Sequence, residues 1–382
     1  MEEISFQFEL SEPSSTSLYL IRAVAAQFVA VGHGIGIVLR LPIATLFAGL
    51  GLMLFFLISG LLISYSLFTK MREQEYRFKH FLINRFSRIY PPLIVSLIFL
   101  LIFDGLWFTN PKFYNPLSFI FTLLLINDTQ LGVAAFGSAR QAWALPLFWW
   151  TYLIFGWIVL GLKLKKKKHI FFLVLSALFF LLILVYSGYI ENSLYSNLKF
   201  LLLWVLGVFI IFLLNSITKH MKKKSSIGRE KDGVFITSIQ FLTENGKFRE
   251  KNALKNALRL GMVFLMTMAL MNLLLYRQPY DIYFMLLIVI LLFFFLLYCQ
   301  FTAFNYSKKA KKIIKFISSY SFSLYLVHYT TFSFMMLFRY DLNNILLFFI
   351  AFAFTNLVAL GIAAISERQY KKINTYLLNK FA

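Results

Sequence analysis

An arginine and a histidine stand eleven residues apart in an otherwise apolar run, in the stretch RAVAAQFVAVGH. Eleven helical steps of about 100° return nearly to the starting direction, so Arg22 and His33 share one face, about 16 Å apart along the axis. A guanidinium binds phosphate oxygens, and a neutral imidazole accepts protons near physiological pH. Arg22 as a membrane-boundary anchor and His33 as a hydrogen-bonded interhelical residue are the alternatives. Between them, small residues predict close approach by a neighbouring helix or a ligand: Ala25, Ala26 and Gly32.

The stretch YRFKHFLINRFSRIYPP carries an arginine pair. Arg85 and Arg88 are three positions apart, so on a helix they project about 60° from one another and can clamp neighbouring phosphates. Apolar residues recur at helical spacing in the same stretch: Phe78, Phe81, Leu82 and Phe86. This pattern predicts an amphipathic cytoplasmic segment within residues 68–88 that lies on the membrane surface before the next span. A basic interfacial helix without a ligand is the alternative.

A polar stripe runs along the apolar segment SSYSFSLYLVHYTTFSF, where Ser321, Tyr325 and His328 stand at i, i+4 and i+7. In a membrane helix such a stripe has to face protein or water rather than lipid. It predicts either a second polar site or hydrogen bonds between helices.

Membrane helices have to position these residues. The 382 residues are 60% hydrophobic and only 14% charged, whereas soluble domains are about 25% charged. This composition predicts an all-α polytopic membrane protein, a single transmembrane domain over residues 1–382. Its single cysteine, Cys299, excludes an intramolecular disulfide. We predict about ten spans, at residues 18–39, 44–67, 89–108, 143–162, 170–188, 198–217, 257–276, 282–303, 317–338 and 343–366.

Basic residues gather in alternate connections between these spans. Of the 38 Lys and Arg residues, 31 fall in five segments: 68–88, 163–168, 218–260, 304–315 and 367–382. The positive-inside rule places these segments and both termini in the cytoplasm. The net charge of +22 therefore reflects topology and contact with membrane lipids, and it does not predict a nucleic-acid partner. We expect residues 218–260 to form a basic cytoplasmic loop with little structure of its own.

The predicted outer side offers candidates for acceptor binding. The connection 109–142 holds an apolar piece at 116–127 that is too short to span and predicts a re-entrant or interfacial segment. Nearby residues suit sugar hydroxyls and ring faces, although an interfacial aromatic belt explains the aromatic ones equally well: Trp143, Tyr152 and Asp104. No metal site is predicted, because the five histidines are scattered and lack a carboxylate at ligand spacing.

Several of these stretches, in consistent order along the whole chain, resemble the integral-membrane acyltransferase-3 family. They are the Arg-x10-His spacing, LFFLISGLLI (54–63), RFSRIYP, SYSFSLYLVH and the terminal ISER. The resemblance implies that His33 is the essential histidine and Arg22 its motif partner, and that Arg85 and Arg88 are the family's arginine pair. The late motifs match a further set: Ser321, Tyr325, His328 and Glu367.

The sequence departs from the family's usual pattern at three positions. Phe148, in WALPLFWWTY, stands where a glutamate is usual, and Met53 stands where an acidic residue often precedes the aromatic pair. Gln369 stands where a proline is expected. These departures point to a divergent acceptor or a weakened activity.

The resemblance implies a stand-alone O-acyltransferase of the bacterial inner membrane. It would move an acyl group, most often acetyl, from cytoplasmic acyl-CoA to a hydroxyl of a cell-surface or lipid-linked carbohydrate, without a metal. Arg22, Arg85 and Arg88 would hold the phosphates of coenzyme A. His33 would act as a general base or form an acyl-histidine. A non-enzymatic flippase of lipid-linked glycans is the alternative.

Overall fold

The chain folds into a bundle of helices. A computed structural model describes residues 9–73, 75–107, 110, 112–128, 133–162, 167–186, 192–231, 239–276, 281–302, 305–340 and 342–381. Every regular element in these ranges is helical, which satisfies backbone hydrogen bonds where lipid offers none. The α-helices are α1 (Glu12–Gly34), α2 (Ala44–Lys70), α3 (Phe78–Asp104), α4 (Pro116–Leu123), α5 (Ala144–Gly156), α6 (Lys167–Tyr186), α7 (Asn192–Lys231), α8 (Ile239–Tyr276), α9 (Ile282–Phe301), α10 (Lys308–Ser318), α11 (Ser321–Met335), α12 (Asn344–Ile365) and α13 (Tyr370–Phe381).

Helix α1 carries both residues of the Arg-x10-His spacing on one unbroken element. It begins at Ser11, whose hydroxyl accepts a hydrogen bond from the backbone N–H of Ser14, with a proline in the first turn. It runs past His33 to Gly34 and continues as a π-helical turn, Ile35–Leu39. The prediction that Arg22 and His33 belong to one helix is therefore confirmed.

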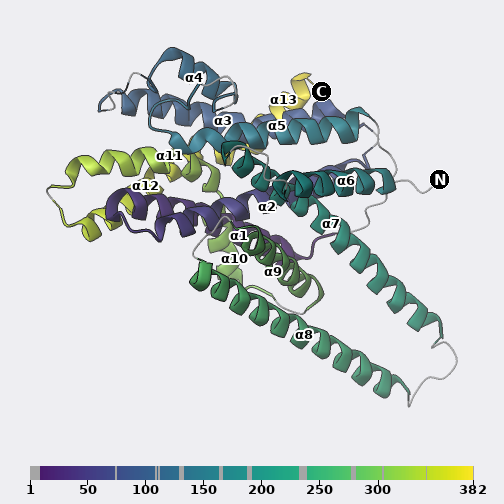
Figure 1. Cartoon of the computed structure of the whole chain (residues 1–382). Helices are drawn as coiled ribbons and strands as arrows, with labels where there is room; N and C mark the ends of the chain where they lie inside the picture. Colours follow the sequence, from purple (N-terminus) through teal and green to yellow (C-terminus); the bar gives the residue numbers. More distant parts are fainter. Residues whose placement is uncertain are drawn as a thin grey trace.

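Small residues let α2 pack directly on α1. A methyl group at Gly32 would overlap backbone atoms of Ala44 and Ala48 on α2. A methyl group at Gly51 would likewise meet the carbonyl oxygen of Ala25. The close approach predicted for this stretch of α1 is thus made by a helix, and α1 also packs against α10 and α11 (Figure 1).

Eight helical segments in the described ranges are long and apolar enough to cross a membrane, which supports a polytopic membrane protein. They are Glu12–Leu39, Ala44–Lys70, Phe78–Asp104, Arg140–Gly161, Asn197–His220, Leu254–Asn272, Ile282–Phe301 and Asn344–Phe381. The two other predicted spans, 170–188 and 317–338, coincide with α6 and α11. The described apolar part of α6 is the short piece His169–Leu178, and α11 has only 15 residues.

Helix α3 corrects the prediction of a separate surface helix before the third span. It is one continuous helix from Phe78 to Asp104, with Pro91 and Pro92 inside it. The two prolines remove two backbone donors and do not end the helix here. Arg85 and Arg88 therefore lie on the first turns of a long membrane helix rather than on an independent surface element.

The ninth predicted span is divided. Helix α10 ends at Ser318, and α11 begins at Ser321 after a break at Ser319 and Tyr320. Helix α10 carries five lysines on an amphipathic surface, whereas α11 is buried along most of its length. The break gives α11 a free N-terminus inside the protein, and its first backbone N–H groups need partners.

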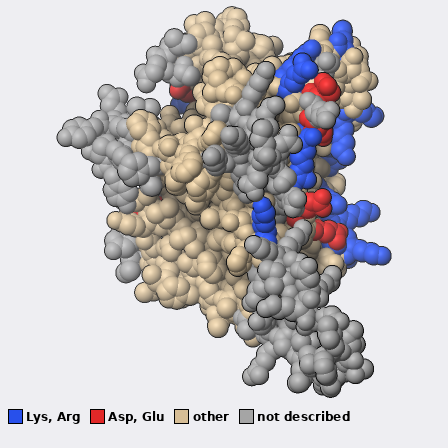
Figure 2. Space-filling model, turned by 90° about the vertical axis from the view of Figure 1, so that its right-hand side faces the viewer, with Lys and Arg blue, Asp and Glu red and all other residues tan. Residues whose placement is uncertain are grey.

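Helices α4, α7 and α8 bear on two further predictions from the sequence. Helix α4, eight residues long, covers most of the segment predicted as re-entrant or interfacial and lies at one end of the bundle (Figure 1). Helices α7 and α8 extend to Lys231 and back from Ile239, so the segment 218–260 is largely helical, contrary to the prediction; residues 232–238 lie outside the described ranges. Lys and Arg gather along one side of the face seen in Figure 2.

Candidate active site

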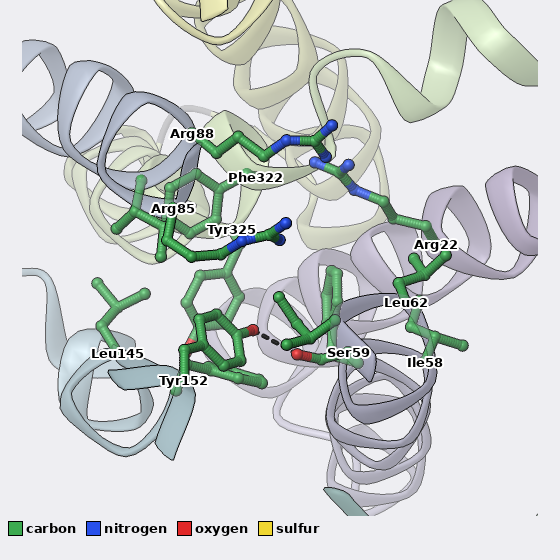
Figure 3. Close-up of a pocket in the computed structure, with 14 residues that line it drawn as sticks. Arg22, Ile58, Ser59, Leu62, Arg85, Arg88, Leu145, Tyr152, Phe322 and Tyr325 are labelled. Carbon is green, nitrogen blue, oxygen red and sulfur yellow. Dashed lines mark hydrogen bonds between the residues drawn. The ribbon is translucent and has the colours of Figure 1, made fainter. Parts of the chain in front are cut away.

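A cavity of about 170 Å³ lies where five helices meet (Figure 3). Helix α1 contributes Arg22, and α3 contributes Arg85 and Arg88. The remaining lining comes from α2, α3, α5 and α11 and is mostly apolar: Phe55, Ile58, Ser59, Leu62, Ile63, Ile89, Leu145, Phe148, Tyr152, Phe322 and Tyr325. The cavity therefore joins three guanidinium groups to an apolar compartment.

Arg85 and Arg88 have no acidic partner among the described residues. Arg85 is buried, and its Nη2 donates to the hydroxyl of Ser66 over 3.2 Å, while its Nε has no partner in the described part of the chain. The guanidinium of Arg88 lies 4.5 Å from the centre of the Tyr370 ring, a cation–π contact that leaves its charge unneutralised. Charged groups held this way attract an anion.

Arg22 is held by Glu367. Its Nη2 lies 2.7 Å from Oε1 of Glu367, which is almost fully buried. The other oxygen of Glu367, Oε2, accepts hydrogen bonds from the backbone N–H and the hydroxyl of Ser323, both at 2.9 Å. Glu367 thus caps the N-terminus of α11 and orients Arg22 at the same time.

Aromatic rings form part of the apolar lining of the cavity. Phe148 stacks on Phe56 with ring centres 4.0 Å apart, and the hydroxyl of Tyr152 hydrogen-bonds with Ser59. The Tyr325 ring packs edge-on against Phe55, and its hydroxyl donates to the carbonyl oxygen of Gln141 over 2.6 Å. Figure 3 shows Tyr152, joined to Ser59 by a hydrogen bond, below the arginines in this view.

The ring of His33, on α1, contacts the ring of a second histidine, His328, on α11. The ring centres of His33 and His328 are 5.1 Å apart, with the planes tilted by 37°, and the Tyr329 ring lies edge-on to His33 at 5.5 Å. Neither histidine lines the cavity. The Tyr325 ring, which does, lies 5.9 Å from His328, so one residue of α11 contacts both the arginine cavity and the histidine pair.

Residues 16–364 match the sequence model of the acyltransferase domain of the acyltransferase-3 family. The chain belongs to this family. The match covers most of the 382 residues and supports acyltransferase activity. Comparisons with curated proteins and with solved structures found no match.

In the structure of this acyltransferase, the four residues predicted to form a second polar site make different contacts. Glu367 forms an ion pair with Arg22, the His328 ring contacts the His33 ring, and Tyr325 lines the arginine cavity. Ser321 is buried, and its hydroxyl donates to the carbonyl oxygen of Ile317 over 3.4 Å. Ser321, Tyr325 and His328 lie on α11 and Glu367 lies in the turn after α12, and a second polar site formed by these four residues stays a prediction.

The predicted acceptor-side residues also separate. Tyr152 lines the arginine cavity instead of an outer surface, and the Trp143 ring packs 5.8 Å from that of Phe200. Asp104 is fully buried and accepts hydrogen bonds from the backbone N–H and the hydroxyl of Ser138, at 2.8 and 2.9 Å. An acceptor-binding role for these residues stays a prediction.

Sequence reasoning missed Ser59, Gln141 and Tyr370 as neighbours of the site. Ser59, in LFFLISGLLI, is a small polar residue inside a long apolar helix, a signal that marks an inward-facing position. Gln141 and Tyr370 give no comparable signal, because both lie near helix ends where polar residues are common. No group of acidic, histidine or cysteine side chains able to hold a metal occurs among the described residues.

Proposed function

We propose that this acyltransferase moves an acyl group, acetyl in particular, from cytoplasmic acyl-CoA to a hydroxyl of a cell-surface or lipid-linked carbohydrate. The observation that carries the proposal is the meeting of Arg22, Arg85 and Arg88 at one cavity, with carboxylate compensation in the described residues only for Arg22. An acyl-CoA brings several negative charges and a long uncharged arm that carries the acyl thioester. The cavity offers matching partners for both.

The donor phosphates are the natural ligands of the arginines. Guanidinium groups bind phosphates through paired N–H donors, and Arg85 and Arg88 project from consecutive turns of α3 in the arrangement that lets two groups grip one diphosphate. A flippase of lipid-linked glycans has no need for a nucleotide-linked thioester. Binding of acyl-CoA at these arginines therefore separates the two functions.

The position of His33 supports a role as general base. It shares α1 with Arg22, about 16 Å further along the axis, and the pantetheine arm of coenzyme A is long enough to bridge such a distance. The unprotonated nitrogen of His33 takes the proton of the acceptor hydroxyl as its oxygen attacks the thioester carbon. The C–S bond then breaks, and the departing thiolate of coenzyme A receives that proton from His33.

We place the arginines on the cytoplasmic side of the inner membrane and the acceptor on the opposite side. The supporting feature is the sequence, because its basic segments are alternate connections between the predicted spans: 68–88, 163–168, 218–260, 304–315 and 367–382. In this orientation, the cytoplasm supplies acyl-CoA directly to the cavity.

The test uses sealed inside-out membrane vesicles from cells that produce the chain, supplied with acetyl-CoA labelled in the acetyl group. We expect label in the carbohydrate or glycolipid fraction, and we expect His33→Ala to lower the transfer by about 10²-fold or more. Transfer by His33→Ala at the native rate removes the general-base assignment. Glycan movement across the membrane with no labelled product supports a flippase instead.

A further inference from the structure

His328 has one nitrogen committed to the backbone. Its Nδ1 lies 3.2 Å from the carbonyl oxygen of Leu324 and 2.9 Å from that of Tyr325. Carbonyl oxygens only accept hydrogen bonds, so Nδ1 has to carry the hydrogen. In a neutral imidazole the other nitrogen, Nε2, is then a bare acceptor.

That acceptor is fully buried and has no hydrogen-bond partner among the described residues. Buried polar atoms of this kind are uncommon, and each calls for a partner or a function. The His33 ring is in contact with His328, at 5.1 Å between ring centres, and the Tyr329 ring lies edge-on to His33 at 5.5 Å. In the part of the chain that the structure describes, no ion pair joins either histidine to an acid.

We propose that His328 is a positioning residue for His33: a turn of the His33 ring, which already contacts His328, brings its N–H to the bare Nε2 of His328. This hydrogen bond leaves the second nitrogen of His33 unprotonated and free to face the acceptor hydroxyl. This inference rests on the proposed role of His33 as the base. When His33 takes the substrate proton, the N–H directed at His328 stays in place and the positive charge is shared between the two rings. The proton then leaves with the thiolate, and His328 ends unchanged.

The arrangement differs from the familiar one in which a carboxylate orients a catalytic histidine. A neutral imidazole with a fixed tautomer does the same orienting work without placing a second charge in the membrane interior. The fixed tautomer comes from α11 itself, because the two carbonyl groups that hold Nδ1 belong to the turn just before His328. The position of α11 against α1 therefore determines whether His33 has the orientation and tautomer that a general base needs.

Two near-isosteric substitutions separate this role from a structural one. The amide of His328→Asn keeps a donor near the Nδ1 position and loses the acceptor at Nε2. The longer amide of His328→Gln places an acceptor oxygen near the Nε2 position and loses the donor to the carbonyl groups. A purely structural histidine would be replaced better by Asn, and a positioning histidine would be replaced better by Gln.

We expect His328→Asn to lower kcat for acetyl transfer by about 10²-fold with the KM for acetyl-CoA unchanged, and His328→Gln to recover about tenfold of that loss. Native-like kcat in His328→Asn, or an Asn variant as active as the Gln variant or more so, overturns the proposal. His33→Ala is measured alongside. If His33→Ala is inactive while His328→Asn is native-like, only this inference fails; if His33→Ala is active, the general-base function and this inference fail together.

Should either His328 variant unfold, spectra of the native protein still test the proposal. Nitrogen-15 spectra of the protein labelled in its histidines report which ring nitrogen carries hydrogen. We expect His328 to be protonated at Nδ1, with its Nε2 signal shifted by a hydrogen bond that His33→Ala removes. A His328 protonated at Nε2, or a spectrum of His328 that is unaffected by His33→Ala, overturns the proposal.

Discussion

Arg22 and Glu367, 345 positions apart in the sequence, are joined by an ion pair with 2.7 Å between Nη2 and Oε1. The same carboxylate receives the first free backbone N–H groups of α11, at Phe322 and Ser323. One side chain therefore links the helix that carries His33 to the helix that carries His328. The orientation of an arginine at the donor cavity and the placement of α11 depend on each other through Glu367.

The double role of Glu367 predicts a graded loss of stability. Glu367→Ala leaves Arg22 without its partner and the buried N–H of Ser323 without an acceptor, which costs about 1–3 kcal/mol in the free energy of unfolding. Glu367→Gln keeps an acceptor for Ser323 and loses only the ion pair, so its loss is smaller. Thermal unfolding of the purified protein in detergent measures both. An Ala variant as stable as the native protein contradicts the capping role.

The crossing of α2 and α7 gives a second prediction, with a control inside the same chain. A methyl group at Gly60 would overlap the carbonyl oxygen of Trp204, so Gly60→Ala forces the two helices apart and costs about 1–3 kcal/mol. Gly361 on α12 has no atom within 4 Å of such a methyl group. Gly361→Ala should therefore be neutral or stabilising by up to about 1 kcal/mol. Equal thermal unfolding temperatures for the two variants contradict the close crossing.

The features of the fold that could be predicted from the sequence are those that depend on residues close together in the chain. Apolar run length gave the membrane class, and helical periodicity put Arg22 and His33 on one helix. The predicted start of the third span was wrong. An amphipathic segment that runs into a membrane helix without a break has the sequence pattern of two separate elements, whereas α3 is one helix. Pro91 and Pro92 strengthened that impression, although a helix tolerates them here.

The site itself depends on packing between distant segments, which no local pattern reports. Charge and topology indicated that the three arginines share one side of the membrane, but not that Arg22 faces Glu367. His33 and His328 each looked like a separate polar residue in its own span, and only the packing of α11 on α1 brings their rings together. The place of Tyr152 in the lining of the arginine cavity could not be predicted, because sequence position along a helix does not say which neighbour a ring meets.

We expect the Phe148 side chain to limit the size of the acyl group that the enzyme transfers. Its ring lines the apolar part of the cavity and stacks on Phe56. Phe148→Ala enlarges this compartment, so kcat/KM for butyryl-CoA relative to acetyl-CoA should rise by about tenfold, the usual effect of fitting one or two methylene groups. Phe148→Leu, which keeps most of the volume, serves as the control. An unchanged ratio in the Ala variant means that the acyl group lies elsewhere.

The arginine pair predicts which part of the donor is recognised. Arg85→Ala and Arg88→Ala each remove a charge-assisted contact worth about 1.5–3 kcal/mol, so each should weaken acetyl-CoA binding by about tenfold to a hundredfold. Acetyl-pantetheine, which lacks the nucleotide phosphates, should bind both variants as it binds the native protein. Arg77→Ala is the matched control, because Arg77 directly precedes α3, has a side chain that is 76% exposed and pairs with Glu75.

Calorimetric titration of the detergent-solubilised protein measures all of these affinities in one buffer. Raising the salt concentration should weaken acetyl-CoA binding to the native protein more than binding to the double variant Arg85→Ala plus Arg88→Ala, since salt screens the interactions of the two guanidinium groups that this variant lacks. Native-like acetyl-CoA affinity in the double variant contradicts the donor site. A parallel loss of acetyl-pantetheine affinity contradicts it as well, because it shows that the arginines support the cavity walls rather than the phosphates.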